Sequence, residues 1–241
     1  MIVQRGVDEL ELVSARSELN GFRLSTRIMP ALDATRGGDW CEAFAISERI
    51  VALSIGDVCG HGPEVYETML TTREVVREAA LRRLGPGQVL ALANRALCRK
   101  RPDVYVSAIF GLLDTHRHTL TFANAGHPPP LTASSLGEHF IELGTGNLLL
   151  GVDAAAVPTV HVVDVPAGTL VVFYTDGVID RRRDATLGPK ALLSAAAFAH
   201  HYSALSAASV IERQMFLTGP NNDDAAILTA RAPSMRLDGA R

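Results

Sequence analysis

Cysteine is scarce in this sequence, and its spacing excludes a disulfide framework. The chain has 241 residues and three cysteines, Cys41, Cys59 and Cys98, none of which forms a Cys-x-x-Cys pair. Disulfide-stapled domains carry a dense and even set of cysteines, whereas an odd number of scattered ones is typical of free thiols. The sequence therefore predicts a protein of a reducing compartment, and we expect it to be cytoplasmic.

Strong net charge and long apolar segments are also missing. The formal net charge is -3, with acidic and basic residues interspersed, so the basic surface that nucleic-acid binding needs is absent. No apolar run approaches the roughly 20 residues of a membrane span. Residues 1–19 carry charges throughout and lack the apolar centre of a signal peptide. The sequence predicts a soluble globular protein that binds neither nucleic acid nor membrane.

Several well-known catalytic motifs are absent as well. There is no Gly-x-x-x-x-Gly-Lys-Ser/Thr sequence of a P-loop and no Gly-x-Ser-x-Gly of a serine hydrolase. In "GTGNLLLG", Leu149 stands where a dinucleotide-binding loop has its third glycine. Tyr174 stands two residues before Asp176, at the position of the nucleophile in aspartyl-phosphate enzymes. The sequence therefore offers no obvious nucleophile for covalent catalysis.

Apolar periodicity predicts strands, then helices, then strands again. Helices are expected over residues 7–20, 64–84 and 89–100, and over 189–216 with an interruption near Ser203. Strands are expected over residues 22–30, 39–46, 50–55, 105–114, 119–125, 159–165, 169–174 and 225–230, with a further hairpin around Gly137. Because strands and helices do not alternate as βαβ units, the pattern predicts an α+β domain with antiparallel sheets.

Aspartates recur at the ends of these apolar strands. Asp57 in "SIGDVCGHG" and Asp176 in "FYTDG" each follow one strand, while Asp39 and the pair Asp223-Asp224 precede others. If the strands are neighbours, the carboxylates cluster, and clustered carboxylates must take up protons or bind a cation. Oxygen ligands suit Mg²⁺ or Mn²⁺ better than zinc, and two such ions can activate water for phosphoryl transfer. Each aspartate alone has the alternative role of a turn former.

Five motifs, in this order, resemble those of the PPM-type metal-dependent serine/threonine protein phosphatases, specifically the bacterial SpoIIE-like branch. They are "GGDWCEAF", "GDVCGHG", "NAGHPPPL", "YTDGVIDRR" and "DDAAIL", and the resemblance extends over residues 22–228. It implies an α+β fold, an α-β-β-α sandwich of two antiparallel sheets flanked by helices, with two Mn²⁺ or Mg²⁺ ions in a cleft at one edge. It implies one phosphatase domain over residues 21–231, between an N-terminal segment (1–20, with the short helix) and a polar tail (232–241).

Carried over position by position, the resemblance implies a set of metal ligands. Asp57 would bridge both ions with the Val58 carbonyl as a further ligand, Asp176 and Asp223 would bind directly, and Asp39 would bind directly or through water. Water activated by the ions would attack phosphorus in line. Asp57 and Asp176 are therefore the predicted catalytic carboxylates.

Two histidines and two glycines lie in the same motifs. His61 is a candidate general acid for the leaving serine oxygen, although a histidine between glycines can also simply hold a turn. We expect His127 of "NAGHPPP", with Asn124, to be structural. The resemblance suggests that Gly56 and Gly60 let the backbone lie close to the ions.

The resemblance implies a phosphoserine or phosphothreonine protein as substrate, and by analogy a STAS-type anti-sigma-factor antagonist. Two alternatives remain open: a phosphatase-like module that binds a kinase or antagonist without turnover, and a phosphatase of small metabolites. Cys41, Glu42 and Ala226 replace the Tyr, Asp and Thr that are usual at these positions. None of these departures removes a predicted ligand, which favours an active enzyme.

Overall fold

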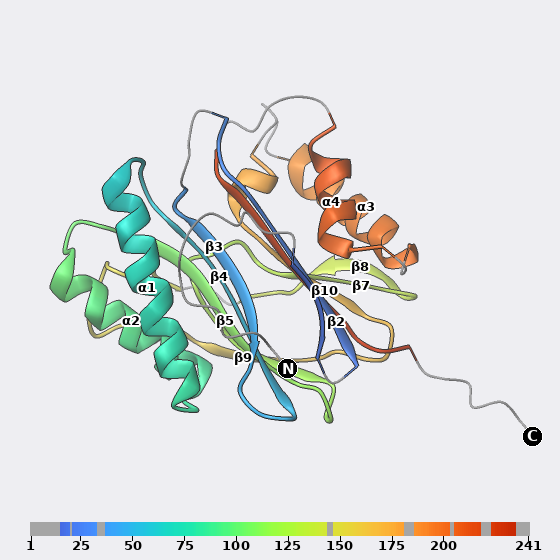
Figure 1. The fold of residues 1–241 in the computed structure, drawn as a ribbon, viewed down its shortest axis with the longest axis horizontal. Helices are drawn as coiled ribbons and strands as arrows, with labels where there is room; N and C mark the ends of the chain where they lie inside the picture. Colours follow the sequence, from blue (N-terminus) through green and yellow to red (C-terminus); the bar gives the residue numbers. More distant parts are fainter. Residues whose placement is uncertain are drawn as a thin grey trace, which may run out of the picture.

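Two antiparallel sheets pack face to face, and a pair of helices covers the outer face of each (Figure 1). The computed structural model describes residues 15–19, 21–32, 37–143, 147–180, 186–202, 205–217 and 223–234. Within these residues the strand order of the first sheet is β3-β4-β5-β6-β9 and that of the second is β1-β2-β11-β10-β7-β8. The predicted α-β-β-α sandwich is confirmed.

The strands of the first sheet are β3 (Asp39–Ala45), β4 (Ile50–Val58), β5 (Val106–Asp114), β6 (Thr119–Ala125) and β9 (Val160–Asp164). The second sheet contains β1 (Ala15–Leu19), β2 (Phe22–Met29), β7 (Leu131–Ser134), β8 (Gly137–Phe140), β10 (Leu170–Tyr174) and β11 (Ala225–Arg231). The central strands are apolar on both faces, because one face meets the other sheet and the opposite face meets helices.

Helices α1 (Pro63–Leu81) and α2 (Pro86–Lys100) cover the first sheet. Helices α3 (Leu187–His201) and α4 (Ala207–Met215) cover the second, and a 3₁₀ turn, η1 (Asp176–Val178), follows β10. Proline at the first position of α1 and α2 suits a helix start, since its missing N–H would have no partner there. In the part of the chain described here, no helix has the length and apolar character needed to cross a membrane.

Apolar side chains fill all three interfaces between the layers. Phe22, Ile109 and Phe173 lie in the core between the sheets. Trp40 lies in the core under α1 and α2, and Ile211 lies in the core under α3 and α4. The strands that carry the candidate site are therefore held by apolar packing between the two sheets and between each sheet and its helices.

The helix expected over residues 7–20 is wrong where the structure describes it. Residues 15–19 form β1, which pairs with β2 so that Leu19 stands opposite Phe22. Gly21, directly before β2, has φ +81°, a conformation that glycine adopts at little cost and that suits a tight turn. Residues 7–14 and residue 20 lie outside the described residues.

The strand that carries Asp57 is longer than predicted. We expected it to end at residue 55, but β4 continues through Val58 because it stays paired with β3 and β5 on both sides. Asp57 therefore lies within a strand and not in a turn after it. The predicted strands 159–165 and 169–174 correspond to β9 and β10, which belong to different sheets.

Candidate metal centre

Asp39 and Asp57 form the centre of the candidate site. They are direct partners on the antiparallel strands β3 and β4, and the charge of each carboxylate acts on its neighbours across the site. Two carboxylates so placed repel each other when both are charged. Burial, and then the charge of Asp57, raise the pKa of Asp39 well above its usual range. Burial, and then the charge of Asp176, raise the pKa of Asp57 to about 6.

Asp176 reaches this site from the other sheet. It is the first residue of η1, directly after β10 and Thr175. Burial, and then the charge of Asp223, raise the pKa of Asp176. The buried Thr175 hydroxyl donates a 2.7 Å hydrogen bond to Oδ2 of Asp39 and accepts one of 2.7 Å from the N–H of Ala226. The end of β10 is thereby fixed beside the Asp39–Asp57 pair.

Asp223 and Asp224, which precede β11, have different surroundings. Asp223 is exposed, and its charge raises the pKa values of both Asp57 and Asp176. Asp224 accepts hydrogen bonds from the backbone N–H groups of Ala31 (3.0 Å) and Gly38 (2.8 Å). Asp224 therefore holds Ala31 and Gly38 near the start of β11. Asp223 accepts a 2.8 Å hydrogen bond from the N–H of Asp224 at Oδ1, and its role as a metal ligand stays a prediction.

The backbone also comes close at the site, but not at the glycines we expected. A Cβ at Gly38 would lie 3.0 Å from the Val58 carbonyl oxygen and 3.6 Å from Oδ1 of Asp57. Gly56 has another role, because a Cβ there would lie 2.1 Å from Cη2 of Trp40. The expectation that Gly56 serves the ions is thus replaced by a packing role beneath the indole ring. Gly60, with φ +113°, shapes the turn that leads to α1.

His61 lies in this turn, between Gly60 and Gly62, and its side chain is exposed. Val58, in contrast, is the buried last residue of β4. The roles of His61 as general acid and of the Val58 carbonyl as ligand stay predictions.

His127 and Asn124 are hydrogen-bonded to each other, which agrees with the expectation from the sequence that both help to form the structure of the loop after β6. The Asn124 side chain accepts a hydrogen bond from the N–H of His127 and donates one to its carbonyl, both at 2.9 Å. This closes the turn that follows β6. The contacts of the imidazole ring are described below.

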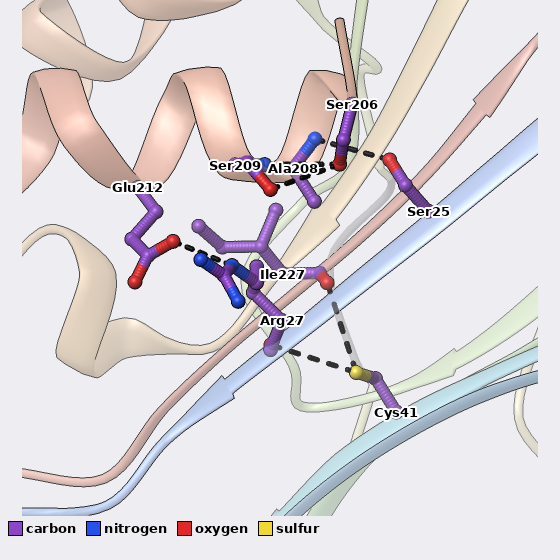
Figure 2. A network of polar contacts seen from close by, with 8 residues as sticks. All are labelled: Ser25, Arg27, Cys41, Ser206, Ala208, Ser209, Glu212 and Ile227. Atoms are coloured by element: carbon purple, nitrogen blue, oxygen red, sulfur yellow. Dashed lines mark hydrogen bonds and ion pairs between the residues drawn. The ribbon is translucent and has the colours of Figure 1, made fainter. Parts of the chain in front are cut away.

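Cys41, which replaces a tyrosine usual in the branch, provides another contact between the sheets (Figure 2). Its thiol donates to the carbonyls of Arg27 on β2 and Ile227 on β11, each at 3.7 Å. Arg27 in turn forms an ion pair with Glu212 on α4. Burial, and then the charge of Asp39, raise the pKa of the Cys41 thiol, which keeps it protonated and unreactive.

The chemistry of the donor groups fits hard divalent cations. All the donors are oxygens, and within the described residues none of the five aspartates forms an ion pair with a basic side chain. A cation would offset the repulsion between the Asp39 and Asp57 carboxylates. As the side chains stand, no three acidic, histidine or cysteine groups among the described residues converge as a finished ligand set.

The curated relatives that match this chain include one protein of Synechocystis and one of Bacillus subtilis. Protein IcfG of Synechocystis is 24% identical over 219 residues, 75% of this chain and 34% of its own length. Phosphoserine phosphatase RsbU of Bacillus subtilis is 22% identical over 142 residues, 58% of this chain and 42% of its own length. The chain thus spans less than half the length of either relative.

Solved structures with this fold include the RsbU and RsbW domains of Rv1364c from Mycobacterium tuberculosis, with 25% identity and a TM-score of 0.81 over 89% of this chain and 61% of that one. RsbX in complex with magnesium has 15% identity and a TM-score of 0.71 over 91% and 99% of the two chains. The catalytic domain of PstP with manganese has 17% identity and a TM-score of 0.62 over 88% and 99%. At the identities of the last two, the likeness shows the fold alone.

The family described as Stage II sporulation protein E (SpoIIE) matches residues 47–233, most of the chain. That range begins just before β4 and ends just after β11, so it includes Asp57, Asp176 and Asp223. The chain belongs to the SpoIIE family, and its sandwich is that of the PPM phosphatases.

Proposed function

We propose that this chain is a Mn²⁺- or Mg²⁺-dependent phosphatase that hydrolyses phosphoserine or phosphothreonine in a protein. The observation that supports this most is the meeting of carboxylates from both sheets, with pKa values raised by burial and then by the charges of the neighbouring aspartates. Two cations would be held by Asp39, Asp57, Asp176 and Asp223 and by the Val58 carbonyl. Raised pKa values at a cluster of like charges are typical of functional sites.

When bound, the cations would lower the pKa of water and offset charge on the phosphoryl oxygens. The protein's part is to hold its oxygen ligands in place. Thr175 donates a hydrogen bond to one Asp39 oxygen and so orients that carboxyl group. Asp224 accepts from the backbone N–H groups of Ala31 and Gly38, which fixes these two residues relative to the start of β11.

The leaving serine oxygen needs a proton. His61 is exposed and lies between β4 and α1, four residues after Asp57. We assign it the role of general acid, because an imidazole can hold and release a proton near neutral pH.

A phosphorylated STAS-type antagonist of an anti-sigma factor is the substrate class that we propose. The similarity to the phosphoserine phosphatase RsbU of Bacillus subtilis supports phosphoserine as the reacting group. The Mycobacterium tuberculosis structure, in which RsbU and RsbW domains belong to one protein, supports a partner from the same signalling system.

The test is hydrolysis of p-nitrophenyl phosphate with and without Mn²⁺ by the native protein, Asp176→Asn and Asp164→Asn. Asp164 is an exposed aspartate at the end of β9 and serves as the matched control. We expect Mn²⁺-dependent turnover that Asp176→Asn abolishes and Asp164→Asn retains. Absence of turnover with any divalent ion, in a protein shown to be folded, would contradict the proposal and favour a binding module.

A second comparison tests the substrate class. Turnover of a phosphoserine peptide, a phosphorylated STAS-domain protein and a sugar phosphate is measured with the same Mn²⁺ concentration. We expect the highest kcat/KM for the protein substrate, and preference for the sugar phosphate would instead identify a phosphatase of small metabolites.

A further inference from the structure

The imidazole ring of His127 connects the two sheets. Its Nδ1 lies 2.7 Å from the hydroxyl of Ser107 on β5, and its Nε2 lies 3.0 Å from the backbone carbonyl of Tyr174, the last residue of β10. His127 is 5% exposed and Tyr174 is 2% exposed. The ring is therefore a buried polar link between β5 in one sheet and β10 in the other.

The partners define which nitrogen carries the proton. A carbonyl oxygen can only accept, so Nε2 carries the hydrogen that is donated to Tyr174. In a neutral ring Nδ1 is then an acceptor, and the Ser107 hydroxyl donates to it. Burial lowers the pKa of His127 to about 4, in agreement with a neutral ring at physiological pH.

Both partners of the ring are adjacent to the candidate metal centre. Ser107 is the direct partner of Asp57 across the β4–β5 pair. Tyr174 lies two residues before Asp176, and the residue between them, Thr175, donates to Asp39. His127 thus connects Ser107, the neighbour of the predicted ligand Asp57 in the first sheet, with β10, the strand of the second sheet that leads to the predicted ligand Asp176.

The turn that carries the ring is itself fixed. Asn124 on β6 holds both the N–H and the carbonyl of His127 through its side-chain amide. Two hydrogen bonds thus hold the backbone of His127 and two more hold its ring, one to each sheet.

We propose that His127 is a positioning residue that sets the separation of Asp57 and Asp176 through Ser107 and the Tyr174 carbonyl. This inference rests on the proposed function, because the separation matters only where both carboxylates hold cations. The His127 ring is buried and both of its nitrogens are hydrogen-bonded within the protein, so His127 does not touch the substrate. Groups that orient metal ligands typically contribute 10–100-fold to metal affinity.

A purely structural role makes a different prediction from a positioning role. If His127 only stabilised the fold, its replacement would lower the melting temperature and leave the Mn²⁺ affinity of the folded protein unchanged. Asn94 provides the matched control, because it is a buried amide on α2 that bonds to the N–H of Gly151 and the carbonyl of Asp153, within the loop before β9.

The experiment measures Mn²⁺ affinity by isothermal titration calorimetry, and kcat and KM on p-nitrophenyl phosphate, below the melting temperature of every variant. The variants of the full chain are His127→Ala, His127→Gln, Ser107→Ala and Asn94→Ala. We expect about 10–100-fold weaker Mn²⁺ binding and a lower kcat for His127→Ala. Partial recovery is expected in His127→Gln, whose amide N–H can still donate to Tyr174. Asn94→Ala should lose melting temperature while keeping the native Mn²⁺ affinity.

The outcomes separate the two proposals. Native Mn²⁺ affinity and kcat in folded His127→Ala would overturn the positioning role and leave the proposed function intact. If the native protein binds no Mn²⁺, the proposed function fails, and the positioning role fails with it. If the native protein binds Mn²⁺ without turnover, the positioning role is tested by comparing the Mn²⁺ affinities of the native protein and of His127→Ala. Histidine ¹⁵N NMR adds a direct signature: we expect a neutral Nε2–H ring in the native protein, and a different tautomer would contradict the hydrogen-bond assignment.

Discussion

Thr175 and Asp39 join the two sheets through one hydrogen bond of 2.7 Å between the threonine hydroxyl and a carboxylate oxygen. The hydroxyl also accepts from the N–H of Ala226, so one side chain fixes β3, β10 and β11 relative to one another. The order of the candidate site thus depends on a residue that is not itself a predicted ligand.

Replacing Thr175 with valine keeps the shape of the side chain and removes both hydrogen bonds. Because the site is fully buried, the Ala226 N–H and an Asp39 oxygen would lose their partners, and each unsatisfied group costs about 1–3 kcal/mol. We expect the free energy of unfolding, measured with urea, to fall by about 2–4 kcal/mol. Thr71→Val, on the exposed face of α1, is the control and should change it by less than about 0.5 kcal/mol. Equal losses in both variants would contradict this account.

The adjacent residues Asp223 and Asp224 should respond in opposite ways to replacement. Asp224→Ala removes the acceptor of two backbone N–H groups, and hydrogen bonds to charged groups contribute about 1.5–3 kcal/mol each. We therefore expect a clear loss of unfolding free energy. Asp223→Ala removes an exposed side chain, so stability should hold while Mn²⁺-dependent hydrolysis is lost. Urea unfolding and p-nitrophenyl phosphate turnover, measured on both variants, test the assignment, and a reversal of the two outcomes would exchange the roles.

His127 makes the stability of the fold depend on pH. Its pKa is about 4 in the folded protein and about 6.5 when unfolded, so between these values the unfolded chain binds a proton that the folded chain does not. Stability is therefore full above pH 6.5 and falls as the pH decreases toward 4, by up to about 3 kcal/mol. In His127→Gln this contribution is absent. The difference in unfolding free energy between the two proteins should shrink between pH 7 and pH 4.5, and a constant difference would show that the ring titrates normally.

Gly56 and Trp40 test the packing under α1. A Cβ at position 56 would overlap the indole ring, which is 1% exposed and donates its Nε1–H to Ser54. Overpacking a close-packed core costs about 1–3 kcal/mol or more, so Gly56→Ala should lower the melting temperature markedly. At Gly85 an added Cβ would only touch Oε1 of Gln88 at 3.7 Å, and Gly85→Ala should cost less than about 1 kcal/mol. Similar melting temperatures for the two variants would contradict the packing role.

Most of the layer architecture could be predicted from the sequence, and so could the aspartates that form the acidic cluster. Continuous apolar runs such as β4 predict strands that are buried on both faces, and such strands require layers on each side. The aspartates were recognisable because each stands beside such a strand. Local sequence patterns could not predict hydrogen bonds between residues far apart in the chain. For example, Asp224 accepts from the N–H of Gly38, 186 residues earlier.

Two further features depended on contacts that local patterns do not encode. The role of Gly56 depends on where the Trp40 ring lies, on the neighbouring strand. Thr175 was not singled out, although "YTDG" contains it, because its importance comes from Asp39 and Ala226 on other strands. The pairing of β1 with β2 is an exception, because the sequence pair "NG" that separates the two strand segments is a local signal for a hairpin.

The place of β11 within the second sheet has a consequence for synthesis on the ribosome. This strand lies between β2 and β10 and is their only hydrogen-bonded connection within the described residues. Until residues 225–231 have left the ribosome, β2 and β10 each present an open edge, which is where chains pair wrongly and chaperones act. Asp223 and Asp224 emerge at the same late moment, so a nascent chain cannot assemble the acidic cluster before its second sheet is ready to close.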